Sequence, residues 1–252
     1  MLQQIKLRVK TSDGQKLHSN WGYSLYGILC QHTDTDYIAE LHSRNETPVS
    51  QYLEVLPGYQ EAIWHISLLG EEAIHYFGQT IAAYDSFYSE HHQTALQIVD
   101  KQIGSPISEH DFCMQYLTEG ETVRRHELEF VTPVGFKSQE QYQIFPTVEL
   151  MLKSLWRSWQ AYAREVRLDG EDVRDQLIQY TQIRDYQLKS VRYPLKGSKI
   201  PACKGKIILQ VHGPEPLARI VSMLLAFGAY SGMGMKTALG MGGYRLNTNE
   251  KA

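Results

Sequence analysis

The feature that most constrains the fold of this chain is an order of predicted elements that occurs twice. Residues 1–11 alternate apolar with basic side chains, and Ile5, Leu7 and Val9 share one side, which is typical of a strand with one buried face. Apolar spacing then predicts helix at 20–42, a strand at 62–69, a helix at 71–84 and a strand at 94–103. A further strand or loop is expected between the first helical region and the second helix. This order is that of the split βαβ, or ferredoxin-like, unit.

The second half repeats the order without repeating the sequence. Its predicted elements are a strand, a helix, two strands, a helix and a strand, at residues 127–133, 148–162, 184–195, 204–213, 214–225 and 243–246. A polar stretch at 118–126 separates the halves. We therefore expect an α+β protein with two ferredoxin-like domains, residues 1–122 and 123–252.

Composition excludes several classes. With 42% hydrophobic and 21% charged residues, the chain has neither disordered, collagen-like nor coiled-coil composition. No apolar run approaches the roughly 18 residues of a membrane helix, and the first residues do not resemble a signal peptide, so we expect a cytoplasmic protein with no membrane contact. Cys30, Cys113 and Cys203 are far apart, which predicts neither a disulfide framework nor a zinc site. We expect no metal and no cofactor.

Charge is distributed unevenly. Residues 1–126 carry 8 Lys and Arg against 16 Asp and Glu, whereas residues 127–252 carry 17 against 12. The positive excess is greatest at 184–206, where seven cations accompany one acid, Asp185. Such a cluster is typical of a surface that binds polyanions, although many cationic hairpins are merely solvated.

The sharpest local motif is GMGMKTALGMGG at 232–243, between the last helix and the last strand. Two Gly-hydrophobic-Gly groups, at Gly232/Gly234 and Gly240/Gly242, permit positive φ and close approach of the backbone to a phosphate, and Lys236 adds a positive charge. The alternative is a turn that only packs a helix against a strand. The motif matches neither a Walker loop nor a dinucleotide fingerprint.

This glycine motif near the C-terminus resembles that of the RAMP superfamily, and specifically of the CRISPR-associated endoribonucleases that process precursor CRISPR RNA. The stretches ELEFVTPVGFKS with IFPTVELMLKSLWRSW, and AELHSRNETPVSQYL, are also similar to that family. The resemblance implies tandem ferredoxin-like, RRM-like domains and metal-independent cleavage within the CRISPR repeat. In that reaction the ribose 2′-OH attacks the adjacent phosphate and leaves 2′,3′-cyclic phosphate and 5′-OH ends.

Two histidines are candidate catalytic residues. His42 falls on the Leu-His position where many members of the family carry a catalytic histidine, and histidine acts as acid or base near neutral pH. His32 is a candidate for a second proton-transfer group. For either residue, the alternative is a polar side chain at a helix end or in a loop.

RNA capture falls to the basic half. The resemblance implies that a hairpin of the second domain enters the base of the repeat stem, and the segment 189–206 has the matching composition. The candidate phosphate contacts in it are Lys189, Arg192, Lys196, Lys199, Lys204 and Lys206. Tyr193 is a candidate for stacking on a base.

Three functions remain open from the sequence. The first is the repeat-specific endoribonuclease, a monomer or homodimer that releases its guide RNA to, or retains it for, the proteins of an effector complex. The second is a non-catalytic RAMP subunit that binds guide RNA in such a complex. The third is an enzyme that binds a small phosphorylated molecule. The first two differ at His42, since only an enzyme requires it for cutting.

Overall fold

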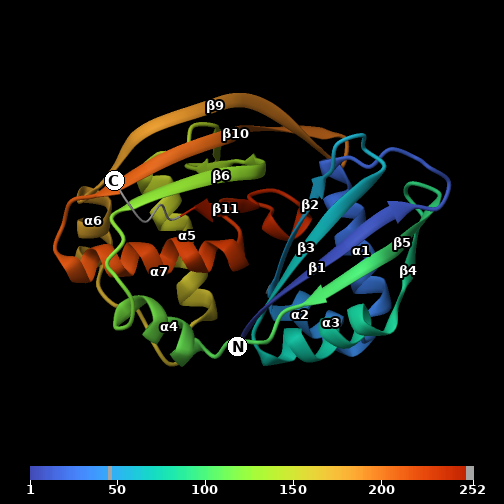
Figure 1. Ribbon diagram of the computed structural model, residues 1–252, viewed down its shortest axis with the longest axis horizontal. Coiled ribbons are helices and arrows are strands. Elements are labelled where there is room, and N and C mark those ends of the chain that lie inside the picture. The colour runs from blue at the N-terminus through green and yellow to red at the C-terminus, as the bar shows by residue number, and fades with distance from the viewer. Residues whose placement is uncertain (45–46, 248–252) are drawn as a thin grey trace. The chain divides into compact units, whose positions relative to one another are not determined.

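The structure, a computed structural model, describes residues 1–44 and 47–247 (Figure 1). It divides into two compact units. Unit 1 comprises residues 1–106 and 236–241, and unit 2 comprises 107–235 and, of the described residues, 242–247. No helix among the described residues is long and apolar enough to cross a membrane.

Unit 1 is a five-stranded antiparallel sheet with helices α1 and α3 packed on one face (Figure 1). Its elements are β1 (Leu2–Thr11), the 3₁₀ helix η1 (Ser19–Trp21), α1 (Gly22–His32), α2 (Thr35–Arg44), β2 (Val49–Val55), β3 (Glu61–Leu69), α3 (Glu71–Ala83), β4 (Ser86–Ser89), β5 (Thr94–Ile103) and the 3₁₀ helix η2 (Thr237–Leu239). The strand order is β2-β3-β1-β5-β4. Strands β2, β3, β1 and β5 have the ferredoxin-like order, and β4 is added at the edge next to β5.

Unit 2 repeats that topology with four strands in its main sheet. Its elements are α4 (Glu109–Leu117), β6 (Arg125–Val134), β7 (Phe136–Ser138), β8 (Gln141–Gln143), α5 (Val148–Tyr162), α6 (Glu171–Gln179), β9 (Thr181–Leu195), β10 (Ser198–Val211), α7 (Glu215–Ser231) and β11 (Tyr244–Asn247). The strand order is β11-β6-β10-β9. The predicted α+β class with tandem ferredoxin-like domains is confirmed.

Local sequence explains the strongest helix of unit 2. The hydroxyl of Thr147 accepts a hydrogen bond from the backbone N–H of Leu150 at 3.2 Å, which caps the first turn of α5. The apolar stripe that predicted this helix is buried, with Leu155 and Trp159 fully enclosed. The helix therefore begins and packs where its sequence predicts.

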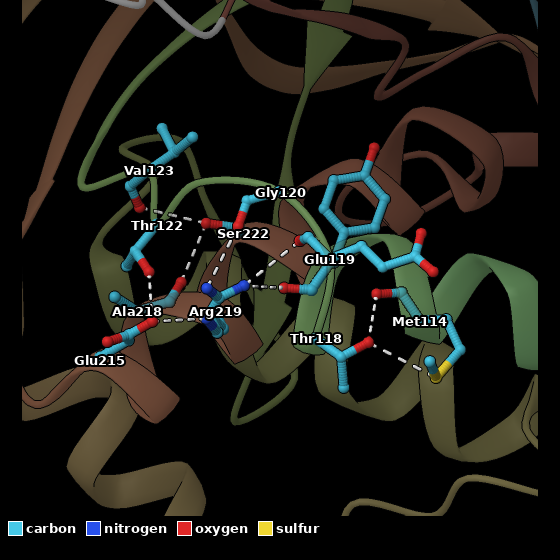
Figure 2. A network of polar contacts seen from close by, with 11 residues as sticks. Met114, Thr118, Glu119, Gly120, Thr122, Val123, Glu215, Ala218, Arg219 and Ser222 are labelled. Carbon is cyan, nitrogen blue, oxygen red and sulfur yellow. Dashed lines mark hydrogen bonds and ion pairs between the residues drawn. The ribbon is translucent and has the colours of Figure 1, made fainter.

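The boundary between the units lies earlier than the polar stretch at 118–126. That stretch is fastened to α7 by Arg219, whose guanidinium donates to the carbonyl oxygens of Glu119 and Gly120 at 3.3 and 3.2 Å and to Glu215 Oε1 at 2.8 Å (Figure 2). In α4, Phe112 is buried and its ring lies 6.1 Å from that of Trp159. Residues 107–122 therefore belong to unit 2, because long-range contacts outweigh their polar composition.

Candidate functional site

The glycine motif adopts the backbone conformation that its composition predicts. Gly232, Gly234, Gly240 and Gly242 have φ of 70°, 84°, 94° and 72°, in the region that favours glycine. Lys236, between the two pairs, also has a positive φ of 60°. The prediction of a positive φ at these glycines is confirmed.

The two ends of the motif are packed against the backbone of unit 2. A Cβ on Gly234 would overlap the carbonyl oxygen of Gly135, and one on Gly242 would overlap that of Met233. The N–H of Gly234 donates to Ser154 Oγ at 2.9 Å, and that of Gly242 donates to the Pro133 oxygen at 2.9 Å. These two N–H groups are therefore not available to a phosphate, because hydrogen bonds within unit 2 engage them. RNA contact at these glycines stays a prediction, and it does not involve those two N–H groups.

The centre of the motif, residues 236–241, belongs to unit 1. The carbonyl oxygen of Lys236 accepts hydrogen bonds from the N–H groups of Leu239 and Met241 at 2.9 and 3.3 Å, which closes a tight turn. The Lys236 side chain is exposed, and it forms no ion pair with the side chains that the structure describes. Lys236 is therefore the part of the motif best suited to an anionic ligand.

Gln51 is a residue of this region that the sequence interpretation missed. Its side chain, only 1% exposed, donates from Nε2 to the carbonyl oxygens of Gly22 and Ala238 at 2.6 and 2.7 Å. The signal available in the sequence was a polar residue between the apolar Val49 and Leu53 of one strand face. A buried amide at such a position requires hydrogen-bond partners.

The two candidate histidines have different surroundings. His42 is exposed on the last turns of α2. His32 ends α1, where its Nδ1 lies 2.9 Å from the carbonyl oxygen of Ile28 and its ring packs edge-on against Tyr84 and Phe87, with centroids 4.9 and 5.4 Å apart. His42 is thus free to meet a substrate from solvent, whereas His32 is already engaged in packing.

The cationic hairpin is formed by β9 and β10 of unit 2. Five of its six candidate cations are exposed and the sixth, Lys204, is half-buried; the exposed ones are Lys189, Arg192, Lys196, Lys199 and Lys206. In the antiparallel register Lys204 lies opposite Lys189, so their side chains leave the same face. Like charges in this position destabilise a sheet.

Lys206 forms ion pairs with acids of β6. Its Nζ lies 3.1 Å from a carboxylate oxygen of Glu127 and 4.0 Å from one of Glu129. The hydrogen bond to Glu127 raises the pKa of Lys206. A phosphate at Lys206 therefore competes with two carboxylates.

Tyr193 is not available to stack on a base, and that prediction is wrong. Its ring is 1% exposed in the outer part of the β9–β10 ladder, opposite Ile200, which is also buried. Alternation along β9 places Arg192 and Pro194 on the exposed side and Tyr193 on the buried side. Burial raises the pKa of the Tyr193 hydroxyl.

Two ferredoxin-like units, one bearing a cationic hairpin, place the chain among the tandem ferredoxin-like proteins. A Cas6 product complex superposes with a TM-score of 0.78 at 22% identity, over 98% of this chain and 99% of that one. A second Cas6 product complex gives a TM-score of 0.80 at 17% identity, over 98% and 99%. These likenesses establish the fold.

Sequence relatives establish the family. A family model described as CRISPR-associated endoribonuclease Cas6 matches residues 128–244. A CRISPR-associated endoribonuclease Cas6 of Streptococcus thermophilus is 30% identical over 223 residues, which cover 88% of this chain and 89% of the relative. One of Mycobacterium tuberculosis is 28% identical over 232 residues, covering 89% and 71%. The chain belongs to the Cas6 family of CRISPR-associated endoribonucleases.

Proposed function

We propose that this protein cleaves precursor CRISPR RNA within the repeat without a metal ion. The ribose 2′-oxygen attacks the adjacent phosphorus, the bond from phosphorus to the 5′-oxygen breaks, and the products end in a 2′,3′-cyclic phosphate and a 5′-OH. One proton leaves the 2′-OH and one joins the departing 5′-oxygen. The reaction therefore needs a group that moves protons and positive charge near the phosphate.

We assign the proton transfer to His42. The observation that carries this assignment is an exposed imidazole on α2, at the position where the sequence resembles the family's Leu-His pair. Histidine is the side chain whose ordinary pKa lies nearest neutral pH, so it can give or take a proton there. His32 stays the second candidate, although its Nδ1 already contacts the Ile28 carbonyl.

We assign RNA binding to the hairpin cations and to Lys236. Lys189, Arg192 and Lys199 are exposed and form no ion pair among the described residues, so their charges are available to phosphates. Cleaved RNA bound there remains for transfer to the proteins of an effector complex. The protein acts in the cytoplasm as a monomer or homodimer in this proposal.

The test is cleavage of the CRISPR repeat RNA from the same genome in buffer with EDTA. We expect the wild type to cut and His42→Ala to lose cutting by at least about 100-fold while RNA affinity stays within a few fold. His75→Ala, at another exposed histidine of unit 1, is the matched control and should cut normally. His32→Ala in the same assay decides whether a second histidine takes part.

Three outcomes would contradict the proposal. Binding without cutting by the wild type would assign the chain to the non-catalytic RAMP subunits. A 3′-OH end on the upstream product would exclude attack by the 2′-OH. Tight binding of small nucleotides without preference for the repeat would favour an enzyme acting on a small phosphorylated molecule.

A further inference from the structure

Gln51 interrupts an apolar surface in unit 1. It lies on β2 between Val49 and Leu53, both of which belong to the hydrophobic core. Its partner in the ladder is Ile66 of β3, another core residue. A valine or leucine here would bury a similar apolar area, so the burial of apolar surface alone does not explain the amide.

The orientation of the Gln51 amide is determined by chemistry. The indole N–H of Trp64, which can only donate, lies 2.8 Å from Gln51 Oε1. This contact places Nε2 toward the carbonyl oxygens of Gly22 and Ala238, which can only accept. All three contacts are buried, and each is lost if the amide is replaced by an apolar group.

The contacts of Gln51 hold the centre of the glycine motif against β2 and α1. Gly22 begins α1, and the Cα of Gly240 is so near that a Cβ on Gly22 would lie 2.6 Å from it. Ala238 is two residues from Lys236, whose carbonyl oxygen accepts from Leu239 and Met241 in the same turn. Little freedom remains for the backbone that carries the Lys236 side chain.

We propose that Gln51 is a positioning residue, which holds residues 236–241 so that exposed Lys236 meets an RNA phosphate. This inference rests on the proposed function, since it takes Lys236 as an RNA contact. The lysine side chain is long and loses entropy when its ammonium binds a phosphate. If the backbone that carries it is already fixed, no further backbone entropy is lost on binding. Gln51 itself, being buried, does not touch the RNA.

The experiment is a double-mutant cycle on affinity for the repeat RNA, with Gln51→Met and Lys236→Met. Methionine keeps the approximate length of both side chains but removes the amide or the charge. We expect each single variant to weaken RNA binding roughly tenfold. The affinity of the double variant should be no lower than that of the single variant with the lower affinity. Additive losses would overturn the positioning role, because an effect through general stability is independent of Lys236.

Amide hydrogen exchange gives a readout that does not depend on RNA. In Gln51→Met we expect faster exchange at Leu239 and Met241, whose N–H groups donate within the turn, and unchanged exchange at Met233 and Met235 of unit 2. Unchanged exchange at Leu239 and Met241 would also overturn the inference. Should Gln51→Met not fold, Gln51→Leu replaces it in both measurements, because leucine also removes the amide and suits the apolar surroundings of Val49 and Leu53.

Failure of the proposed function has a different signature. If Lys236→Met binds RNA as tightly as the wild type, Lys236 is not an RNA contact, and both that assignment and the inference fall. If Lys236→Met weakens binding but the cycle is additive, only the role of Gln51 falls.

Discussion

Lys189 and Lys204 lie directly opposite one another in the β9–β10 ladder of unit 2, with both side chains on the same face. Two like charges in this position repel each other across a short distance. Sheets ordinarily avoid the pair, and a bound polyanion removes the repulsion. The pair is therefore a place at which the proposed RNA binding by the hairpin can be tested against folding stability.

Reversing one of these charges should separate the two effects. We expect Lys189→Glu to raise the free energy of unfolding by about 0.5 kcal/mol, because opposite charges then face each other, and to weaken repeat-RNA binding by more than about tenfold. Urea unfolding and a binding titration measure the two quantities. Lys10→Glu is the control with the opposite effect on stability. It places a second carboxylate opposite Glu61 in unit 1, so the variant should be less stable and should bind RNA with nearly unchanged affinity. Equal RNA affinity in the two variants would count against the hairpin as the RNA surface.

Glu129 lies between two cations of the same sheet, 4.0 Å from Lys206 Nζ and 3.8 Å from Arg245 Nη1. We expect Glu129→Gln to strengthen RNA binding by about two- to fivefold and to steepen its salt dependence, because it removes one of the carboxylates that compete with phosphate for Lys206 and Arg245. Stability should change by less than about 1 kcal/mol, since these pairs are partly exposed and have long N–O distances. Binding titrations between low and high salt test this. As a control, Glu140→Gln removes an exposed acid paired with Lys137 and should not alter affinity.

Two glycines of α1 make a matched pair for the glycine motif. A Cβ on Gly22 would lie 2.6 Å from Gly240 Cα and 2.7 Å from the Leu239 oxygen, whereas one on Gly27 meets nothing within 4 Å. We expect Gly22→Ala to cost about 1–3 kcal/mol of stability and to weaken RNA binding. Gly27→Ala should instead gain about 0.5–1 kcal/mol, because alanine favours a helix. Chemical denaturation of both variants decides the matter, and equal stability would mean that the motif does not pack on α1 as described.

His126 should make stability depend on pH. Burial lowers the pKa of His126 from its ordinary 6.5 to about 4, and its Nδ1 has no partner among the described residues. Between pH 6.5 and 4, His126 is therefore protonated in the unfolded state but largely neutral in the folded state. The stability that a neutral His126 provides is full above about pH 6.5 and declines as the pH falls toward 4, by about 2 kcal/mol between pH 7 and 5.

The check is to compare urea unfolding at pH 7 and pH 5 in the wild type and in His126→Phe. The variant cannot titrate at this site, so its loss between the two pH values should be smaller by about 2 kcal/mol. Burial also lowers the pKa of His92 to about 4. His92 therefore adds the same pH dependence to the stability of both proteins, and its effect cancels in the comparison. His110→Gln, at an exposed histidine, should behave as the wild type. An unchanged pH dependence in His126→Phe would show that His126 takes up a proton as readily in the folded state as in the unfolded state.

Much of the fold was predictable because its signals are local. The alternation in 1–11 predicted β1, and the apolar stripe with Leu155 and Trp159 predicted α5, since period and burial follow from neighbouring residues. Strands β2 and β4 and helices α4 and α6 carried no comparably clear pattern and were not assigned. The glycine positions predicted positive φ, because no other residue adopts it so readily.

What the sequence by itself determined is the order of elements, the uneven charge and the family-like motifs around His42 and Gly232–Gly243. Tertiary structure alone decided which groups meet: Gln51 with Ala238, Arg219 with Gly120, and Lys206 with Glu127. It also placed Tyr193 inside, although its neighbours Arg192 and Pro194 are exposed. The physical reason is range, since a residue's neighbours in sequence set its backbone preference, while its partners and burial depend on residues far along the chain.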